Sequence, residues 1–136
     1  LIVTGGPGWT RAAEDQETLD FIRGTRARVT SMCTGAMILA AAGTLDGKQS
    51  TTKREVFEGE VPPLDLLAKK HAVTASALVD SGGVVTSGGV TLGLDAMFYC
   101  LARSHGETIA ADVARVMEYS RALAVNKAAL GYRRDG

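Results

Sequence analysis

The sequence predicts an α/β fold with a mostly parallel sheet, and three observations support this expectation. The chain of 136 residues is 46% hydrophobic but only 5% aromatic, and it contains 16 glycines. Such a composition is typical of alanine-rich helices that are joined to strands by tight turns. Short runs typical of buried strands alternate with segments of helical periodicity. The length suits a single domain, residues 1–136, with one hydrophobic core.

The first part of the chain predicts a strand, a loop and a helix. Residues 1–4 form a strand-like run that leads into the glycine loop 5–8. A parallel strand needs neighbouring strands and helices on both faces of its sheet, but no strand or helix precedes this run in the sequence. We therefore expect that the chain lacks an N-terminal βα segment of its fold. Residues 14–24 begin with acidic side chains and carry Leu19 and Ile22 on one face, which predicts a surface helix.

The next segments join a strand directly to a helix. Residues 27–32 predict the second strand, and residues 34–43 predict a helix that is apolar on nearly every side and therefore buried. Gly43 is a suitable C-terminal cap. A turn and a short extended piece at 49–52 follow, and a Pro-Pro pair then predicts the start of a helix through 64–70.

The second half of the chain predicts a hairpin and three helices. Residues 80–83 read Asp-Ser-Gly-Gly, which is typical of the turn between two antiparallel strands. Helices are expected over 90–106 and 107–119 because apolar residues recur there at helical spacing. These residues are Val90, Leu94, Met97, Phe98 and Leu101, then Ile109, Val113, Val116 and Met117. The tail predicts a weaker helix followed by a polar end. Its basic residues, expected on a solvated helix face, are Arg121, Lys127, Arg133 and Arg134.

Charge and cysteine content argue against several classes of protein. Fifteen basic and fifteen acidic residues leave no net charge, so we expect no nucleic-acid partner. No run approaches the roughly 20 apolar residues that cross a bilayer, so no membrane partner is expected either. Two widely separated cysteines, Cys33 and Cys100, form no disulfide framework, which favours a cytoplasmic setting.

Cys33 lies at the abrupt junction between the second strand and the buried helix. A nucleophile elbow needs a strand, a strained residue and a helix, with small residues two positions away on each side; Ser31 and Gly35 supply these. Such a side chain lies at the carboxyl end of the sheet, where α/β folds bind ligands, and the helix N-terminus favours a thiolate. Alternatively, Cys33 is a small buried hydrophobic residue, as free cysteines usually are. The junction favours the reactive role.

A cysteine that attacks an sp or sp² carbon creates negative charge on the substrate, and fixed donors must stabilise that charge. In an elbow, one donor is the backbone N–H of the next residue, Thr34. The 5–8 loop could supply a second, or it could be only a tight turn. Another glycine loop, 86–91, could form a wall of the same pocket. The candidate binding residues are Gly5, Gly6, Pro7, Thr34, Ser87, Gly88 and Gly89.

Neither histidine is placed as an obvious partner for Cys33. His71 follows a lysine-rich helix end and is expected to be solvated. His105 begins a His-x-Glu pattern that superficially resembles the pair of amidotransferases, but it lies between two helices. Neither histidine has metal-ligand spacing, so we expect no metal. Asp95, four residues after Thr91, is expected to make a buried structural hydrogen bond.

Two stretches carry a family resemblance: SMCTGAMILAAAGTLDGKQSTTK at 31–53 and VVTSGGVTLGLDAMFYCLARSHG at 84–106. They resemble the DJ-1/PfpI (ThiJ/PfpI) superfamily, with its class I glutamine amidotransferase-like fold, and within it the branch of isonitrile hydratases and of sensor domains of AraC-type regulators. The resemblance extends from residue 1 to about residue 119. It implies a flavodoxin-like three-layer α/β sandwich, usually a homodimer, with Cys33 as nucleophile and Thr34 beside it.

The sequence departs from the family pattern in two places. Family members carry an acidic residue on an N-terminal segment that contacts the cysteine, and that segment has no counterpart here. The branch often has Thr-Thr-His-Trp where this chain has Thr51-Thr52-Lys53-Arg54, so a lysine replaces the histidine. The residue after the cysteine is Thr34 rather than the histidine of the protease-like PfpI branch, which argues against that subgroup.

The resemblance implies an isonitrile hydratase-like enzyme without a cofactor, acting on a small-molecule electrophile such as an isocyanide. Cys33 and Thr34 would be catalytic: the isocyanide would become an N-substituted formamide through a thioimidate on Cys33, and Thr34 would orient the thiol or the attacking water. The N–H groups of Gly6 and Thr34 would stabilise developing charge. Two alternatives stay open. One is a non-catalytic ligand-sensing domain, and the other is a redox or stress-response protein with an oxidisable Cys33.

Overall fold

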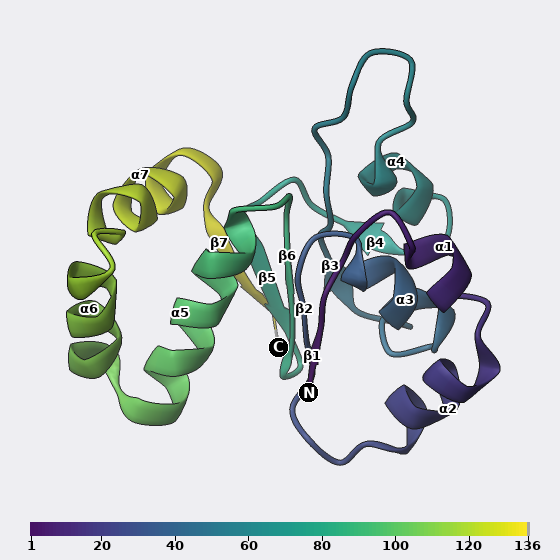
Figure 1. Ribbon diagram of the computed structural model, residues 1–136, viewed down its shortest axis with the longest axis horizontal. Coiled ribbons are helices and arrows are strands. Elements are labelled where there is room, and N and C mark those ends of the chain that lie inside the picture. Colours follow the sequence, from purple (N-terminus) through teal and green to yellow (C-terminus); the bar gives the residue numbers. More distant parts are fainter. Residues whose placement is uncertain (136) are drawn as a thin grey trace.

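The computed structural model describes residues 1–135 and places helices on both faces of a central five-stranded sheet (Figure 1). The strand order is β1-β2-β6-β5-β7. β1 (Ile2–Val3), β2 (Thr30–Ser31) and β6 (Val84–Ser87) are parallel, β5 (Leu78–Ser81) is antiparallel to β6, and β7 (Tyr132–Asp135) is parallel to β5. The predicted three-layer α/β sandwich with a mostly parallel sheet is therefore confirmed.

The parallel strands fix where a site can form. β1, β2 and β6 all end at the same edge of the sheet, so the loops that follow them lie close together. These loops contain residues 4–8, 32–34 and 88–91, which include the elbow and both glycine loops. The carboxyl edge of the sheet thus brings together segments that are far apart in the sequence.

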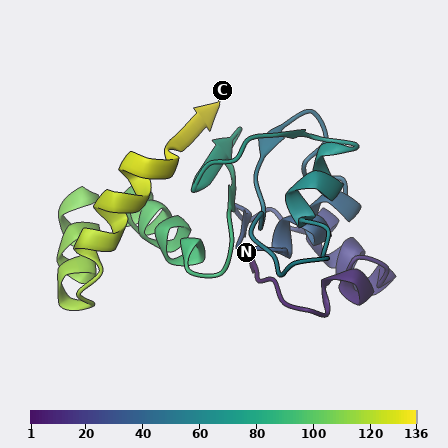
Figure 2. The ribbon, with the colours of Figure 1, turned by 90° about the horizontal axis from the view of Figure 1, so that it is seen from above.

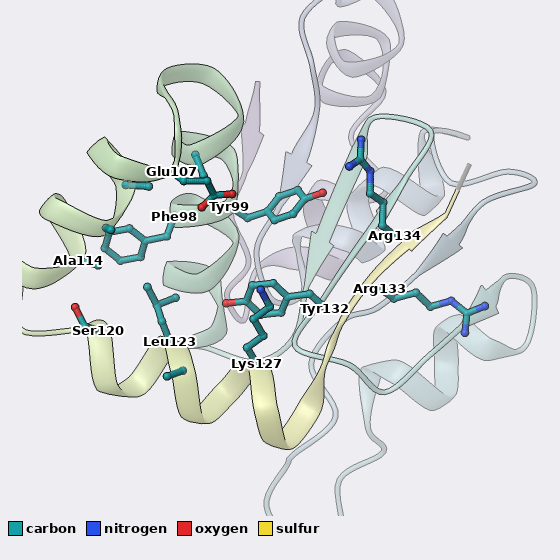
Figure 3. A pocket seen from close by; sticks show the side chains of 14 residues that line it. Phe98, Tyr99, Glu107, Ala114, Ser120, Leu123, Lys127, Tyr132, Arg133 and Arg134 are labelled. Carbon is teal, nitrogen blue, oxygen red and sulfur yellow. The ribbon is translucent and has the colours of Figure 1, made fainter.

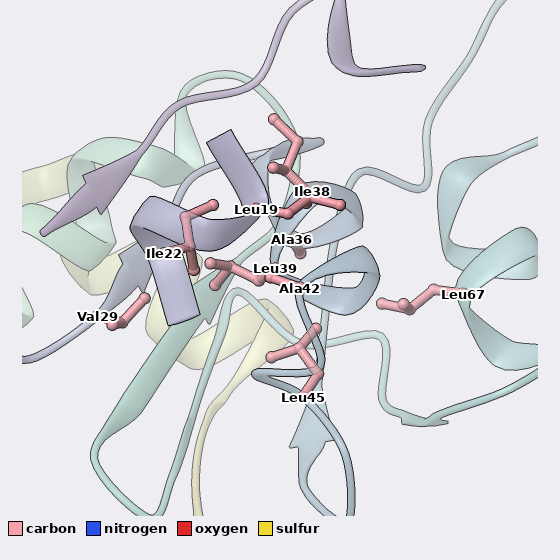
Figure 4. Packing of buried hydrophobic residues seen from close by; sticks show 9 residues of the cluster. All are labelled: Leu19, Ile22, Val29, Ala36, Ile38, Leu39, Ala42, Leu45 and Leu67. Carbon is pink, nitrogen blue, oxygen red and sulfur yellow. The ribbon is translucent and has the colours of Figure 1, made fainter. Parts of the chain in front are cut away.

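Four helices lie on one side of the sheet (Figure 1): α3 (Gly35–Ala41) packs directly on β1 and β2, and α1 (Trp9–Ala12), α2 (Gln16–Gly24) and α4 (Pro63–Ala68) pack around α3. Most of the hydrophobic core lies between these helices and the sheet (Figure 4). Its buried residues are Leu19, Ile22, Val29, Ala36, Ile38, Leu39, Ala42, Leu45 and Leu67. Burial of these aliphatic side chains is the main force that holds α3, and with it the elbow, against the sheet.

The helix expected over 14–24 is confirmed as α2, and its start has a clear cause. Asp15 is the N-cap, and its carboxylate accepts a hydrogen bond of 3.0 Å from the backbone N–H of Thr18. Leu19 and Ile22 face the core, as their spacing predicts. The short helix α1 just before it was not predicted.

Two pairs of short strands form between α3 and α5 along the chain. β3 (Gln49–Ser50) pairs with β4 (Ala72–Val73) in a separate two-stranded parallel sheet. β5 and β6 form the predicted hairpin, and its turn residues Gly82 and Gly83 have φ of 58° and 85°. Positive φ at both central residues is the requirement of the tight turns that suit a twisted hairpin.

The other face of the sheet carries α5 (Leu92–His105), with α6 (Glu107–Val116) and α7 (Ser120–Leu130) beyond it (Figures 1 and 2). Asp95 on α5 is completely buried. Its carboxylate accepts hydrogen bonds from the hydroxyls of Tyr119 (2.9 Å) and Tyr132 (2.7 Å) and from the amide of Asn126 (3.1 Å). The predicted structural role of Asp95 is confirmed.

Two expectations for the second half of the chain are wrong, and a third is confirmed with an unexpected orientation. Val90 precedes α5 and is 73% exposed, because the backbone is still in the loop after β6. The helix expected over 107–119 is confirmed as α6, which ends at Val116; its apolar stripe from Ile109 to Met117 faces outward, and only Ala110 and Ala114 are buried. Arg133 and Arg134 lie on β7 rather than on a helix face, since the chain after α7 adds an edge strand to the sheet.

Within residues 1–135, no helix has both the length and the apolar character that crossing a membrane requires.

Candidate active site

The elbow is built as the sequence predicts. Cys33 follows β2, precedes α3 and has φ of 54°, a left-handed conformation that is uncommon for any residue except glycine. The chain can turn this sharply only because its neighbours are small. A Cβ atom on Gly35 would lie 2.1 Å from the carbonyl oxygen of Val3. Glycine at position 35 therefore allows α3 to begin directly against β1.

Thr34 links the elbow to the first glycine loop. The backbone N–H of Gly6 donates to Thr34 Oγ1 at 3.0 Å, and Thr34 Oγ1 faces the Gly6 carbonyl oxygen at 3.4 Å. A Cβ on Gly5 would lie 2.6 Å from Thr34 Oγ1 and 2.7 Å from Thr34 N, so the close approach requires glycine there. The two expected charge-stabilising donors, Gly6 N–H and Thr34 N–H, thus lie on neighbouring loops. The Gly6 N–H already donates its hydrogen bond to the Thr34 hydroxyl.

A third segment, Thr51–Thr52 after β3, also supports the elbow, and this role was not predicted from the sequence. The hydroxyl of Thr52 donates to the carbonyl oxygen of Cys33 at 2.7 Å, and the N–H of Thr51 donates to Thr86 Oγ1 at 2.9 Å. Thr51 and Thr52 are almost completely buried. The adjacent threonines after β3 were visible in the sequence, but no local pattern showed that they would reach the cysteine.

Cys33 is partly exposed and opens onto a cavity of about 560 Å³. Most of the wall is apolar, and two charged residues, Lys53 and Glu60, also line it. The lining residues are Gly6, Pro7, Trp9, Cys33, Thr34, Lys53, Val56, Glu60, Val61, Pro63, Leu66 and Val90. A space of this size and character suits a small organic ligand with its reactive atom at Cys33.

The second glycine loop lies in an adjoining cavity of about 270 Å³. Gly88 and Gly89 line this cavity, and Lys53 and Val90 line both cavities. Ser87 is buried and its hydroxyl donates to the carbonyl oxygen of Ser31 at 3.3 Å, so it supports the strands. The candidate residues of the elbow and of the first glycine loop thus line one cavity, and those of the second glycine loop line the cavity beside it.

The histidines lie in contrasting surroundings. His71 was expected to be solvated, but its side chain is only 12% exposed and its Nδ1 lies 4.0 Å from Asp46 Oδ1, because the chain after α4 folds back toward the loop after α3. His105 ends α5, which begins near the carboxyl end of β6 and runs back toward the other end of the sheet (Figure 1). Among residues 1–135, no cluster of three His, Cys, Asp or Glu side chains is arranged to hold a metal ion.

A separate cavity of about 540 Å³ lies between α5, α6, α7 and β7 (Figure 3). Phe98 and several alanines form its apolar wall, and Lys127 lies 5.4 Å from the ring centre of Tyr132. Burial and the hydrogen bonds to Asp95 raise the pKa of Tyr119 to about 12 and raise the pKa of Tyr132 well above its ordinary value. None of the candidate site residues lines this cavity.

Among known proteins, the chain is similar in sequence to an isonitrile hydratase and to a transcriptional regulator. No family model matches the chain. Isonitrile hydratase from Pseudomonas putida is 41% identical over 98 residues, which is 70% of this chain and 40% of that protein. The HTH-type transcriptional regulator GbdR from Pseudomonas aeruginosa is 28% identical over 127 residues, 89% of this chain and 32% of the regulator.

One solved structure is also similar to the chain. The ThiJ/PfpI family protein from Pseudomonas syringae superimposes with a TM-score of 0.73 at 33% identity, covering 88% of this chain and 49% of that protein. The chain spans about half or less of the length of these three relatives. In sequence and in fold, the chain is similar to the ThiJ/PfpI family protein, and it shares its fold with solved DJ-1 structures.

Proposed function

We propose that this protein is a cysteine-dependent hydratase that converts an isocyanide and water into an N-substituted formamide. The observation that carries the proposal is the elbow, where Cys33 has φ of 54° and opens onto a cavity of about 560 Å³. The 41% identity to an isonitrile hydratase supports this choice of reaction.

In the first step, the sulfur of Cys33 forms a bond to the terminal carbon of the isocyanide. The proton of the thiol moves to that carbon, which gives a thioimidate, R–N=CH–S–Cys33. The substituent R would lie against the apolar wall of the cavity, which includes Trp9, Val56 and Leu66. An apolar wall also limits access of bulk water while the adduct forms.

In the second step, one water molecule hydrolyses the adduct. The water oxygen bonds to the thioimidate carbon and one of its protons moves to nitrogen; the C–S bond then breaks. The second water proton returns to sulfur, so the products are R–NH–CHO and the free thiol. The N–H group of Thr34 would stabilise the oxygen on the tetrahedral carbon. The Gly6 N–H and the Thr34 hydroxyl are hydrogen-bonded to each other, so they would have to exchange this bond for the developing oxygen and the attacking water.

Replacement of each cysteine tests the proposal. We expect Cys33→Ala to lower formamide production from cyclohexyl isocyanide by about a thousandfold or more, since removal of a nucleophile removes the covalent route. Cys100→Ala is the matched control, because Cys100 lies on α5 with its sulfur 3.3 Å from Thr30 Oγ1 and does not line the Cys33 cavity. Equal formamide production by the two variants would refute the proposal.

A second candidate function is ligand sensing without turnover. The match to the regulator GbdR extends over 89% of this chain, more than the 70% matched by the hydratase, which is the observation in its favour. A sensor would bind a small molecule in the same cavity and release it unchanged. Saturable calorimetric binding of an isocyanide, with no formamide formed at high protein concentration, would favour this function over the first.

The expected homodimer and cytoplasmic setting belong to the same proposal. The outward apolar stripe of α6, from Ile109 to Met117, is a surface that a second copy could cover. Analytical sedimentation at several protein concentrations measures the oligomeric state. A monomer at every concentration would contradict the expected homodimer.

A further inference from the structure

We propose that Lys53 makes the site selective for electrophiles that carry a carboxylate or another anionic group. The inference deepens the proposed function and rests on it in one respect, namely that Cys33 is the reacting group. It names the substrate class: a small isocyanide with an acidic substituent, whose reactive carbon lies at Cys33 while its negative charge lies beside Lys53.

The position of Lys53 is fixed by its neighbour in the chain. Thr52 is buried and its hydroxyl donates to the carbonyl oxygen of Cys33 at 2.7 Å, so the residue that follows must lie beside the elbow. Lys53 lines the Cys33 cavity and also the adjoining one. Its Nζ lies 3.7 Å from the point where a Cβ on Gly89 would be, so the side chain extends toward the second glycine loop.

The charge of Lys53 lacks a partner among the described residues. No carboxylate of residues 1–135 lies within salt-bridge distance of its ammonium group. Arg54 is already engaged by Glu55 at 3.5 Å and by the carbonyl oxygen of Ala75 at 3.3 Å. Glu60 lines the same cavity as Lys53 without forming an ion pair with it, and its carboxylate accepts a hydrogen bond from the backbone N–H of Phe57 at 3.2 Å.

Lys53 as a whole residue is partly buried, and an unpaired ammonium group beside an apolar wall favours an anionic ligand. Partial loss of water raises the free energy of the charge, and a counter-charge offsets that cost. The adjoining cavity of about 270 Å³ provides room for the acidic group, and the carboxylate of Glu55, which also lines it, is paired with Arg54 at 3.5 Å. Lysine acts here as a point charge, so it selects for negative charge rather than for one geometry of anion.

Alkylation of Cys33 tests the inference without any isocyanide. Iodoacetate and iodoacetamide react with thiolates by the same displacement and differ in charge, so the ratio of their rates at Cys33 cancels any change in thiolate population. We expect Lys53→Met to lower the iodoacetate-to-iodoacetamide ratio about fivefold, in keeping with a partly solvated charge pair. In Lys53→Arg the iodoacetate-to-iodoacetamide ratio should stay close to that of the unaltered protein. Lys69→Met, at an exposed residue after α4, is the matched control and should leave it unchanged.

An unchanged ratio in Lys53→Met would overturn the inference, and so would failure of both reagents to label Cys33. If Lys53→Met does not fold, salt provides the second test on the unaltered protein: raising NaCl from about 0.01 M to about 1 M should lower the ratio by screening, and a constant ratio would overturn the inference. Hydration of isocyanides, measured with both isocyanoacetate and the neutral cyclohexyl isocyanide, tests the proposed function separately. A lysine-dependent alkylation ratio with hydration of neither isocyanide would therefore reject the reaction and keep the role of Lys53.

Discussion

At the scale of single residues, the backbone of Cys33 is the most informative feature. Its φ of 54° costs an L-residue other than glycine about 1–2 kcal/mol. The surroundings maintain this conformation: Thr52 binds the Cys33 carbonyl, and Gly35 lets the next helix pack against β1. Strain that is held in place by several contacts is typical of functional positions.

This strain predicts an unusual order of stabilities. Cys33→Gly should be more stable than Cys33→Ala by about 1 kcal/mol, because glycine adopts positive φ without the steric cost. In α3, where the backbone is helical, Ala41→Gly should instead destabilise the protein by about 1 kcal/mol. Urea unfolding of the three variants measures both effects. If Cys33→Ala were the more stable of the Cys33 pair, the elbow conformation would be wrong.

The first glycine loop gives a second prediction at this scale. Gly5→Ala would place a Cβ 2.6 Å from Thr34 Oγ1, so we expect a loss of about 2 kcal/mol of stability and slower alkylation of Cys33 as the elbow shifts. Gly8→Ala is the matched control, because nothing lies within 4 Å of its Cβ position. Similar unfolding midpoints for the two variants would contradict the packing described here.

At the scale of elements, Asp95 joins α5 to α7 and β7. It accepts three hydrogen bonds from neutral donors while fully buried. Asp95→Ala should destabilise the protein by about 3 kcal/mol, because it leaves Tyr119, Tyr132 and Asn126 without their acceptor. Asp112→Ala, on the exposed surface of α6, should change stability by less than about 0.5 kcal/mol. Equal effects in thermal unfolding would show that Asp95 does not hold these elements together.

The same cluster predicts a loss of stability at alkaline pH. Burial and the bond to Asp95 raise the pKa of Tyr119 from 10.0 to about 12, so folding favours the protonated phenol. Its contribution is complete below pH 10 and disappears as the pH rises through about 12. Tyr119→Phe should therefore lose less stability than the unaltered protein over that interval. Superimposable pH profiles in urea unfolding would contradict this assignment.

Local sequence patterns predicted most elements but not all long-range pairings. The hairpin at Gly82-Gly83 and the helix α2 follow from turn chemistry, capping and spacing, all of which act within a few residues. β7 could not be foreseen, because its four residues become a strand only through pairing with β5. The stripe on α6 was recognised, but the sequence alone did not show that it would face outward.

At the scale of the whole molecule, the site is assembled from loops that meet at one edge of the sheet. Sequence reasoning named Cys33, Thr34 and the first glycine loop as candidates, since an elbow has a recognisable pattern of small residues, and Gly6, Pro7, Cys33 and Thr34 line the cavity. It did not find Trp9 or Glu60 as lining residues. They lie in a short helix and in an irregular stretch, and only the tertiary fold brings them to the cavity.

The central claim is that Cys33 is the nucleophile of this fold. The most direct test is the rate at which limiting iodoacetamide labels each cysteine of the native protein, measured by peptide mass. We predict that Cys33 is labelled at least about tenfold faster than Cys100, because its thiol opens onto the large cavity from an elbow while the Cys100 sulfur is engaged by Thr30. Equal rates, or faster labelling of Cys100, would contradict the account.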